Sequence, residues 1–483
     1  MATSTLNTKS PLEEEGFSCR VLVPMATSTL NTKSPLEEEG FSCRVLASLP
    51  LLDLLQMRGV CKLWRSLVGS RIVSEAWSSA HCSRDGAGGE EGSGSAPWFV
   101  MGVGCSSNDP GVDDQFAAFD TASHRWVPFE AFLSSTCSEA ALLPLGGPSL
   151  TRVLHSLPTF RAAPFKAVGS DNGSGLVCFI CRPAHTVSND VPFSLVMLNP
   201  VTGAHTILPH PPANFYSGHL EVDRLDIHLQ ALPGHHYRVF LTPTSDFCCP
   251  GTMDIFDSRS GSWTAGRSWT AWSFDYYFDK DAKIGGAKEL AHADLLRLSH
   301  WTSSIFAYSV DLDEWSRINV DSKKLQVRFS FSFFGLYPNA YKVFRHRGRV
   351  LLAAFQLQGR MSNCPEGFAV WELHLHANDV PPNAYTDVAE WVEVARTPPK
   401  LWERLYGVDH DIPTCLKEYE ARPFLQTEII VSGGLICMTA YSENTSYAPL
   451  MYDLNRQVWY HLPPCKEECY DVTALFGFRP SLA

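Results

Sequence analysis

One short pattern recurs along most of this 483-residue chain and restricts the folds open to it. In each copy a strand-like apolar run ends in a polar residue. Six positions later there is another residue, which is aromatic in most copies. The pattern appears in AAFDTASHRW, VMLNPVTGAH, DIFDSRSGSW, FAYSVDLDEW and LMYDLNRQVW, and in stretched form in AVWELHLH…AEW; the paired residues are Asp120 and Trp126, Asn199 and His205, Asp257 and Trp263, Ser309 and Trp315, Asp453 and Trp459, and Glu372 and Trp391. Each copy predicts two antiparallel strands joined by a polar turn, in which Asp or Asn caps the turn and the aromatic ring packs on the next sheet.

A second strand signal precedes most copies of this pattern. A Gly-containing turn followed by an apolar strand is clear in GSGLVCFICR, GHHYRVFLTP, GRVLLAAF and GGLICMTAY, whereas LLRLSHW lacks the Gly. Each unit therefore has about four strands, and six units over residues 97–483 predict a six-bladed β-propeller. The C-terminal VTALFGFRPSL can pair beside the first blade and close the ring. The alternative is a two-sheet sandwich or another all-β repeat.

Several of these stretches carry a family resemblance. NPVTGAHTILP, YSVDLDEW, YDLNRQVWYHLPPC and FGFRPSL resemble the degenerate kelch-repeat region of plant-type F-box/kelch proteins, although only Gly433-Gly434 keeps a kelch double glycine. The resemblance implies a mostly β fold with a six-bladed, kelch-like propeller.

A compact helical segment precedes the repeats, from Leu49 to Val68 (LPLLDLLQMRGVCKLWRSLV). Pro50 fits a first helical turn, Leu51 and Leu54 follow at helical spacing, and Gly59 ends the run. A second amphipathic run places Val60, Cys61, Trp64, Leu67 and Val68 on one face. Two helices of this size are too small to fold alone, so they need a partner surface.

This segment, with the following SEAW, resembles the second half of an F-box. The resemblance implies binding to the Skp-type adaptor of cullin–RING ubiquitin ligases through Leu49, Pro50, Leu54, Leu55, Val60, Cys61, Trp64 and Trp77. The family's first helix opens with Leu-Pro, but Glu37 and Glu38 stand at that place, and Gly40 costs about 1 kcal/mol of helix propensity. We therefore expect a degraded first helix. The alternative for the whole segment is a small helical cap on the next domain.

The N-terminal region and a later linker set the predicted domain limits. Residues 1–22 and 25–46 are identical, so residues 1–36 are read as a duplicated, disordered segment. The F-box is expected at residues 37–82 and the propeller at 97–483. Between them, residues 83–96 (SRDGAGGEEGSGSA) read as a flexible Gly/Ser/Glu linker.

Charge and hydropathy exclude two classes of partner. The net charge is −12, which argues against nucleic acid, because phosphate contacts need clustered Lys and Arg. The one basic run, Lys342, Arg345, Arg347 and Arg349, reads as a solvated turn before a strand, with an anion site as the alternative. No apolar stretch reaches 18 residues, so we expect no membrane partner.

No motif for catalysis or a cofactor is present in the sequence. Cys178 and Cys181 form the only CxxC, which reads as core because residues three apart in a strand face opposite sides. Cys465 and Cys469, His235 and His236, and the acidic Asp311, Asp313 and Glu314 have no supporting ligand pattern. We therefore expect no metal, no cofactor and no enzymatic activity. A kelch-type copper oxidase would need convergent Tyr, Cys and His in the channel.

The sequence thus predicts a substrate-recognition adaptor of a Skp–cullin–F-box ubiquitin ligase. Its partners would be the Skp-type adaptor, through it a cullin–RING ligase, and an unidentified protein substrate held by the propeller. The alternative is a propeller scaffold that no longer engages the ligase. Fifteen Cys without a secretory segment indicate a reducing compartment, so the nucleus, the cytoplasm or both are expected.

Overall fold

The computed structural model describes the elements of the chain and their immediate turns. The described ranges are 42–49, 51–57, 62–68, 70–82, 96–104, 115–128, 166–169, 175–181, 193–201, 204–212, 225–234, 236–243, 251–269, 283–298, 305–321, 341–357, 365–375, 389–406, 426–442, 445–446, 449–463 and 471–480. The chain divides into two units, Met1–Ser42 and Cys43–Ala483, and the description below concerns the second. The predicted N-terminal segment 1–36 and most of the linker 83–96 lie outside the described residues.

Four helices come first in the described chain. A helix over 42–47 stands where the degraded first helix was expected, and three more follow: α2 (Leu51–Met57), α3 (Lys62–Val68) and α4 (Arg71–Cys82). The sequence predicted two helices up to Val68, and α4 was missed. Ser70 explains its start, because the Ser70 hydroxyl oxygen accepts the N–H of Val73 at 3.4 Å, as an N-cap residue does.

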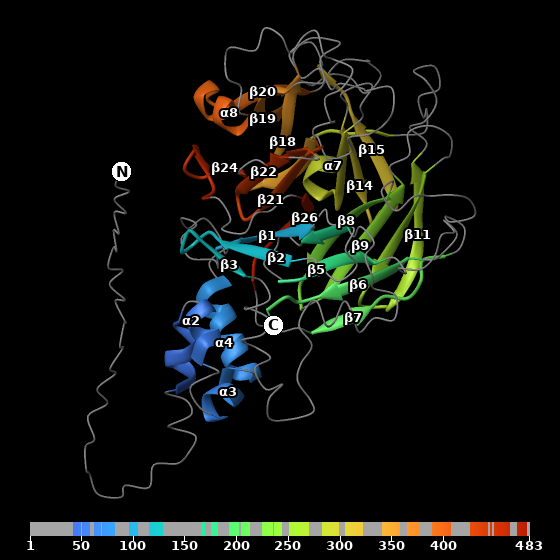
Figure 1. Ribbon diagram of the computed structural model, residues 1–483. Helices are drawn as coiled ribbons and strands as arrows, with labels where there is room; N and C mark the ends of the chain where they lie inside the picture. Colours follow the sequence, from blue (N-terminus) through green and yellow to red (C-terminus); the bar gives the residue numbers. More distant parts are fainter. Residues whose placement is uncertain are drawn as a thin grey trace, which may run out of the picture. The chain divides into compact units, whose positions relative to one another are not determined.

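Six sheets follow and form a six-bladed β-propeller, as the repeats predicted (Figure 1). Blade 1 has the order β26-β1-β2-β3, from β1 (Trp98–Gly104), β2 (Gln115–Asp120), β3 (Arg125–Pro128) and β26 (Asp471–Phe478). Blade 2 comprises β4 (Lys166–Gly169), β5 (Val177–Cys181), β6 (Ser194–Leu198) and β7 (His205–Ile207). Blade 3 comprises β8 (Leu225–Leu232), β9 (His236–Pro243), β10 (Gly251–Asp257) and β11 (Ser262–Trp269).

The other three blades are less regular. Blade 4 has three antiparallel strands, β13 (Leu295–Leu298), β14 (Ile305–Ser309) and β15 (Glu314–Ile318), with β12 (Lys283–Ile284) added in parallel and α7 (Ala287–His292) beside it. Blade 5 comprises β17 (Tyr341–His346), β18 (Arg349–Leu357), β19 (Pro365–Leu375), β20 (Ala389–Arg396) and the parallel edge strand β16 (Val320–Asp321), and α8 (Pro399–Tyr406) follows it. Blade 6 comprises β21 (Gln426–Ser432), β22 (Leu435–Ser442), β23 (Thr445–Ser446), β24 (Leu450–Asp453) and β25 (Val458–His461).

Ring closure uses both ends of the propeller sequence. β26 pairs antiparallel with β1, with Phe478 opposite Trp98 and Phe476 opposite Val100. The last strand therefore becomes the innermost strand of the first blade, as VTALFGFRPSL predicted. This pairing covers the inner edge of β1.

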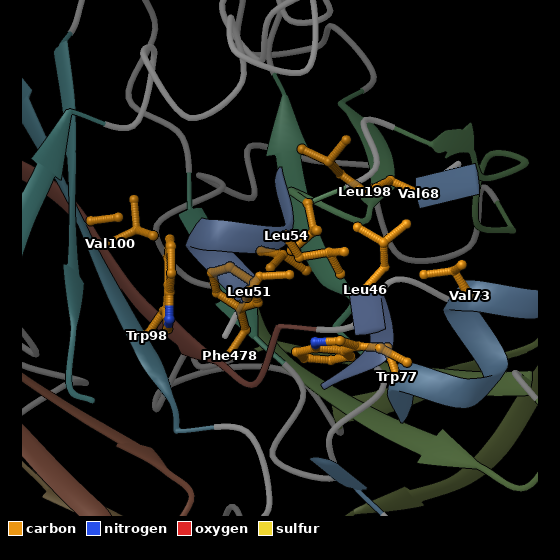
Figure 2. Packing of buried hydrophobic residues seen from close by; sticks show 14 of the residues in the cluster. Leu46, Leu51, Leu54, Val68, Val73, Trp77, Trp98, Val100, Leu198 and Phe478 are labelled. Atoms are coloured by element: carbon orange, nitrogen blue, oxygen red, sulfur yellow. The ribbon is translucent and has the colours of Figure 1, made fainter. Parts of the chain in front are cut away.

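The core is divided among the blade interfaces, because alternate residues of a strand face opposite neighbours. In β18, Leu351 and Ala353 pack toward blade 6, whereas Leu352 and Ala354 pack toward blade 4. Six buried clusters result, one for each pair of neighbouring blades. The cluster of blades 1 and 2 also contains residues of the helical segment, among them Leu46, Leu54 and Trp77 (Figure 2).

The recurring polar and aromatic residues make different contacts in the hairpins. Asp120, Asn199, Asp257 and Asp453 each accept a backbone N–H two residues later, at 2.9, 2.9, 2.8 and 2.9 Å, which caps the turn. The indole N–H groups donate to backbone oxygens of the preceding blade or of the segment just after it. Trp126 donates to Pro463 at 2.6 Å, Trp263 to Pro209 at 2.7 Å and Trp315 to Arg267 at 3.0 Å. The recurring Trp therefore links each of these blades to the one before it by a hydrogen bond.

Replacing Trp263 by Phe tests how much this hydrogen bond between blades stabilises the fold. The variant loses the bond to Pro209, and we expect the free energy of unfolding to fall by about 1 kcal/mol beyond the loss of ring area. Trp391→Phe is the matched control, because its buried Nε1 has no hydrogen-bond partner among the described residues. Denaturant unfolding of both variants measures the difference. A loss in Trp263→Phe no larger than its lost ring area explains would show that the indole bond adds nothing.

Candidate functional site

Several residues of the helical segment are fully buried in the cluster that it shares with blades 1 and 2. Leu46, Leu54 and Val73 are 0% exposed and Trp77 is 1% exposed. The indole N–H of Trp77 donates to the backbone oxygen of Leu49 at 3.1 Å, which ties α4 to the chain just before α2. These contacts hold the short helices in one arrangement.

The predicted adaptor-binding residues fall into three groups in this structure. Leu54 and Trp77 are interior, while Leu49 and Trp64 are half-buried against the same cluster. The side chains of Pro50, Leu55, Val60 and Cys61 lie outside the described residues. Leu54 and Trp77 therefore belong to the packed interior, whereas Leu49 and Trp64 remain partly accessible.

Two apolar residues of the helical segment point outward. Ile72 in α4 is 67% exposed, and Val45 in the helix over 42–47 is 39% exposed. The buried residues of the helix over 42–47 are Cys43, Leu46 and Ala47, so Val45 lies on its other side. The helical period of Val73, Ala76 and Trp77 marks the inner side of α4 and could have identified Ile72 as outward.

The two ends of the propeller differ in the chain segments that connect the strands. Because neighbouring strands run antiparallel, connections alternate between the ends. One end, here the turn face, carries the short connections 121–124, 233–235, 258–261, 310–313, 347–348, 433–434 and 454–457, with longer ones at 170–176, 199–204 and 376–388. The other end, the loop face, carries connections such as 105–114, 129–165, 182–193, 208–224, 322–340 and 397–425. β1 starts at the turn face, so the chain enters the propeller there.

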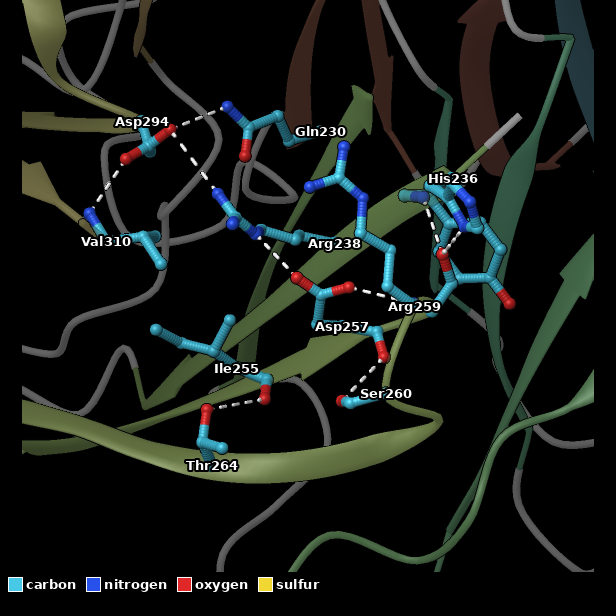
Figure 3. A network of polar contacts seen from close by, with 12 residues as sticks. Gln230, His236, Arg238, Ile255, Asp257, Arg259, Ser260, Thr264, Asp294 and Val310 are labelled. Atoms are coloured by element: carbon cyan, nitrogen blue, oxygen red, sulfur yellow. Dashed lines mark hydrogen bonds and ion pairs between the residues drawn. The ribbon is translucent and has the colours of Figure 1, made fainter. Parts of the chain in front are cut away.

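A polar network joins blades 3 and 4 at the turn face (Figure 3). Arg238 of β9 contacts the carboxylate of Asp257 at 3.0 Å and that of Asp294 at 3.8 Å. Asp294 also accepts the side-chain N–H of Gln230 at 2.9 Å and the backbone N–H of Val310 at 2.7 Å. Hydrogen bonds and the Arg238 charge hold the pKa of Asp257 below its usual range, although burial opposes them. This network orders turns and presents no convergent catalytic set.

The Cys, His and Asp residues weighed above as possible ligands are buried or hydrogen-bonded within the fold where the structure describes them. Cys178 is buried in β5, and burial raises the pKa of its thiol to about 12. His236 is half-buried with Nδ1 3.5 Å from the Ser258 hydroxyl, and Asp313 accepts the backbone N–H of Arg267 at 2.9 Å. Cys465, Cys469 and His235 lie outside the described residues. Within the described part of the chain, no three His, Cys, Asp or Glu side chains converge as metal ligands.

Asp254 is a buried carboxyl group without a described partner. It is 2% exposed, its Oδ2 has no hydrogen-bond partner among the described residues, and burial raises its pKa to about 6. The folded state therefore binds a proton more tightly than the unfolded state between about pH 4 and 6. Stability falls as the pH rises through that window, by up to about 3 kcal/mol at neutral pH.

We expect Asp254→Asn to raise the melting temperature at pH 7.5, because no charge is then buried. The gain over the parent chain is expected to shrink as the pH falls from 6 to 4. Melting curves across pH 4–8 measure both effects, with the exposed Asp311→Asn as control. A gain that does not change with pH would contradict the raised pKa.

A comparison with known protein families finds a match in the helical segment. The F-box domain family model matches residues 42–75, from the helix over 42–47 into α4. No curated protein matches the chain. None of the described helices is long and apolar enough to cross a membrane.

Similar solved structures include two lectins and a peptidase. The SapL1 lectin in complex with α-methyl fucoside shares 12% identity, with 77% of this chain and 98% of that chain covered and a TM-score of 0.32. The Aleuria aurantia lectin, described as a six-bladed β-propeller, shares 14% identity over 76% and 97% of the chains, with a TM-score of 0.32. The Pyrococcus horikoshii acylaminoacyl peptidase shares 8% identity over 60% and 45%, with a TM-score of 0.26. The sheet topology of this chain, and not these similarities, defines its fold.

Proposed function

We propose that this chain is a substrate-recognition adaptor of a Skp–cullin–F-box ubiquitin ligase, of the plant F-box/kelch type. The F-box at 37–82 binds the Skp-type adaptor, and the propeller at 97–483 binds a protein substrate. The observation that carries the proposal is the F-box match at residues 42–75 directly ahead of a closed propeller. The protein acts in the nucleus, the cytoplasm or both.

In this role the chain catalyses nothing itself. Other subunits transfer ubiquitin, and the adaptor contributes proximity by raising the local concentration of substrate lysines near the transferring enzyme. A closed ring suits this task, because loops and turns on a rigid scaffold can hold a partner. Stoichiometric copper or zinc in the purified protein would instead support an enzyme.

Calorimetric titration of the full chain with a purified Skp-type adaptor tests the proposal. We expect micromolar or tighter binding, which corresponds to about −8 kcal/mol or better. Trp64→Ala and Ile72→Asp are expected to weaken it by about 2 kcal/mol each, because apolar anchors dominate such interfaces. Leu312→Ala is the control, since Leu312 is 65% exposed in a propeller turn.

The alternative function gives a different result in the same titration. If the short helix over 42–47 no longer supports docking, the adaptor does not bind and the propeller is an independent binding scaffold. Binding that is indifferent to Trp64→Ala, Ile72→Asp and Leu54→Ala would also remove the docking proposal. Neither result requires a known substrate.

A further inference from the structure

One buried cluster joins the helical segment to the two strands that close the ring. It contains Leu51 and Leu54 of α2 together with Trp98 of β1 and Phe478 of β26, and all four side chains are buried. Figure 2 shows Leu51 next to Phe478 in that cluster. Because Phe478 stands opposite Trp98 across the two strands, the helical segment packs where the first and last strands of the propeller meet.

The turn after β6 brings blade 2 into the same cluster. Val201 stands two positions after the recurring polar residue Asn199, is 0% exposed and belongs to the cluster shared with the helices. In four other blades the residue at this turn position is exposed: Ala122, Arg259, Asp311 and Asn455. Blade 2 therefore has a buried apolar turn residue at a position that faces solvent elsewhere in the ring.

The helices depend on packing for their stability. α2 and α3 have seven residues each and α4 has twelve, and isolated helices of such lengths are marginal in water. Their buried residues, such as Leu54, Val73 and Trp77, lie in a cluster to which the propeller contributes Trp98, Val201 and Phe478. Part of the surface that stabilises the helices is therefore supplied by the ring.

We propose that the adaptor-binding helices are fully folded only when the propeller ring is closed. The strand β26 closes blade 1 and also contributes Phe476 and Phe478 to the cluster that buries Leu54 and Trp77. Ring closure at the end of the chain is thereby coupled to helix folding near its start, and such coupling acts in both directions. The consequence rests on the proposed function: a chain with an open ring does not recruit the ligase.

Two matched pairs of variants in the full chain test the coupling. Phe478→Leu and Phe368→Leu make the same change in side chains that are both 0% exposed, but Phe368 lies in the cluster of blades 5 and 6. Val201→Asn and Asp311→Asn place the same residue at the same turn position of blades 2 and 4, buried in the first and exposed in the second. Only the first member of each pair changes the cluster that contains the helices.

Hydrogen exchange of the α4 amides, with no ligase subunit present, is the measurement. We expect exchange at least tenfold faster than in the parent chain for Phe478→Leu and Val201→Asn, because short helices open locally when their packing is weakened. For Phe368→Leu and Asp311→Asn, the α4 rates are expected to stay within twofold of the parent chain. Unchanged exchange of the β14 amides in Val201→Asn would show that the ring of that variant is folded.

Either of two results would overturn the inference. One is α4 exchange that is equally fast in Phe478→Leu and Phe368→Leu, and the other is α4 exchange that Val201→Asn leaves unchanged. Both would mean that the helices fold independently of the ring.

Titration with the Skp-type adaptor separates this inference from the proposed function. If the parent chain binds the adaptor, Phe478→Leu is expected to weaken binding at least threefold and Phe368→Leu less than twofold. A parent chain that does not bind the adaptor refutes the proposed function, while the exchange rates of α4 still decide whether the helices and the ring are coupled.

Discussion

Removal of residues 471–483 is expected to leave a chain that does not unfold cooperatively. The truncation removes β26, the innermost strand of blade 1, and exposes the paired edge of β1. It also removes Phe476, whose ring centroid lies 5.5 Å from that of Phe179 in blade 2. An open ring with unpaired, apolar edges is prone to aggregate.

Point substitutions give the same test without loss of chain. Phe476 and Phe478 are 1% and 0% exposed, and replacing either by Ala is expected to cost about 3–5 kcal/mol. Ile207→Ala is the control, because Ile207 is 51% exposed in β7 and such sites change stability by about 0.5 kcal/mol or less. Denaturant unfolding measures all three. A Phe478→Ala variant as stable as the Ile207→Ala variant would show that β26 does not hold the ring closed.

Trp77→Ala is expected to disorder the helical segment and abolish adaptor binding in the full chain. The side chain is 1% exposed and ties α4 to Leu49, so its removal leaves a cavity and a lost hydrogen bond worth about 3–5 kcal/mol together. Helices this short depend on packing, since their isolated stability is marginal. Hydrogen exchange of the α4 amides reports the loss directly.

Two further variants separate packing from hydrogen bonding at this position. Trp77→Phe keeps most of the ring and loses the bond to Leu49, so a cost of about 1 kcal/mol is expected. Ser79→Ala changes an exposed residue of the same helix and is expected to leave exchange and adaptor binding unchanged. Unchanged α4 protection in Trp77→Ala would contradict the interior role of this residue.

Most of the propeller could be predicted because its signals are local. Turn caps such as Asp120 and Asp257 act within two or three residues, and alternating apolar residues mark each strand. The missing Gly before LLRLSHW coincided with an irregular blade: blade 4 has three antiparallel strands within the described residues. The sequence could not show that β12 would pair in parallel with β15, because that contact spans two separate segments.

The helical segment was predicted less completely. The apolar spacing of Leu51, Leu54, Trp64 and Leu67 predicted α2 and α3, but the Ser70 cap of α4 was overlooked. Helical period alone does not say whether an apolar residue faces a core or a partner. Leu54 and Trp77 read as partner contacts in the sequence, and the structure places them inside. Whether they also serve adaptor binding stays a prediction.

The sequence by itself determined the number of blades, the place of ring closure and the helical segment ahead of them, because turn chemistry and residue period act over a few positions. Only the tertiary structure decided which apolar residues face inward and which turns of neighbouring blades meet. His346, Asn455 and Arg479 belong to three segments, and their packing around Gly433-Gly434 brings those segments together. Such contacts depend on distances across the ring, which no short stretch of sequence encodes.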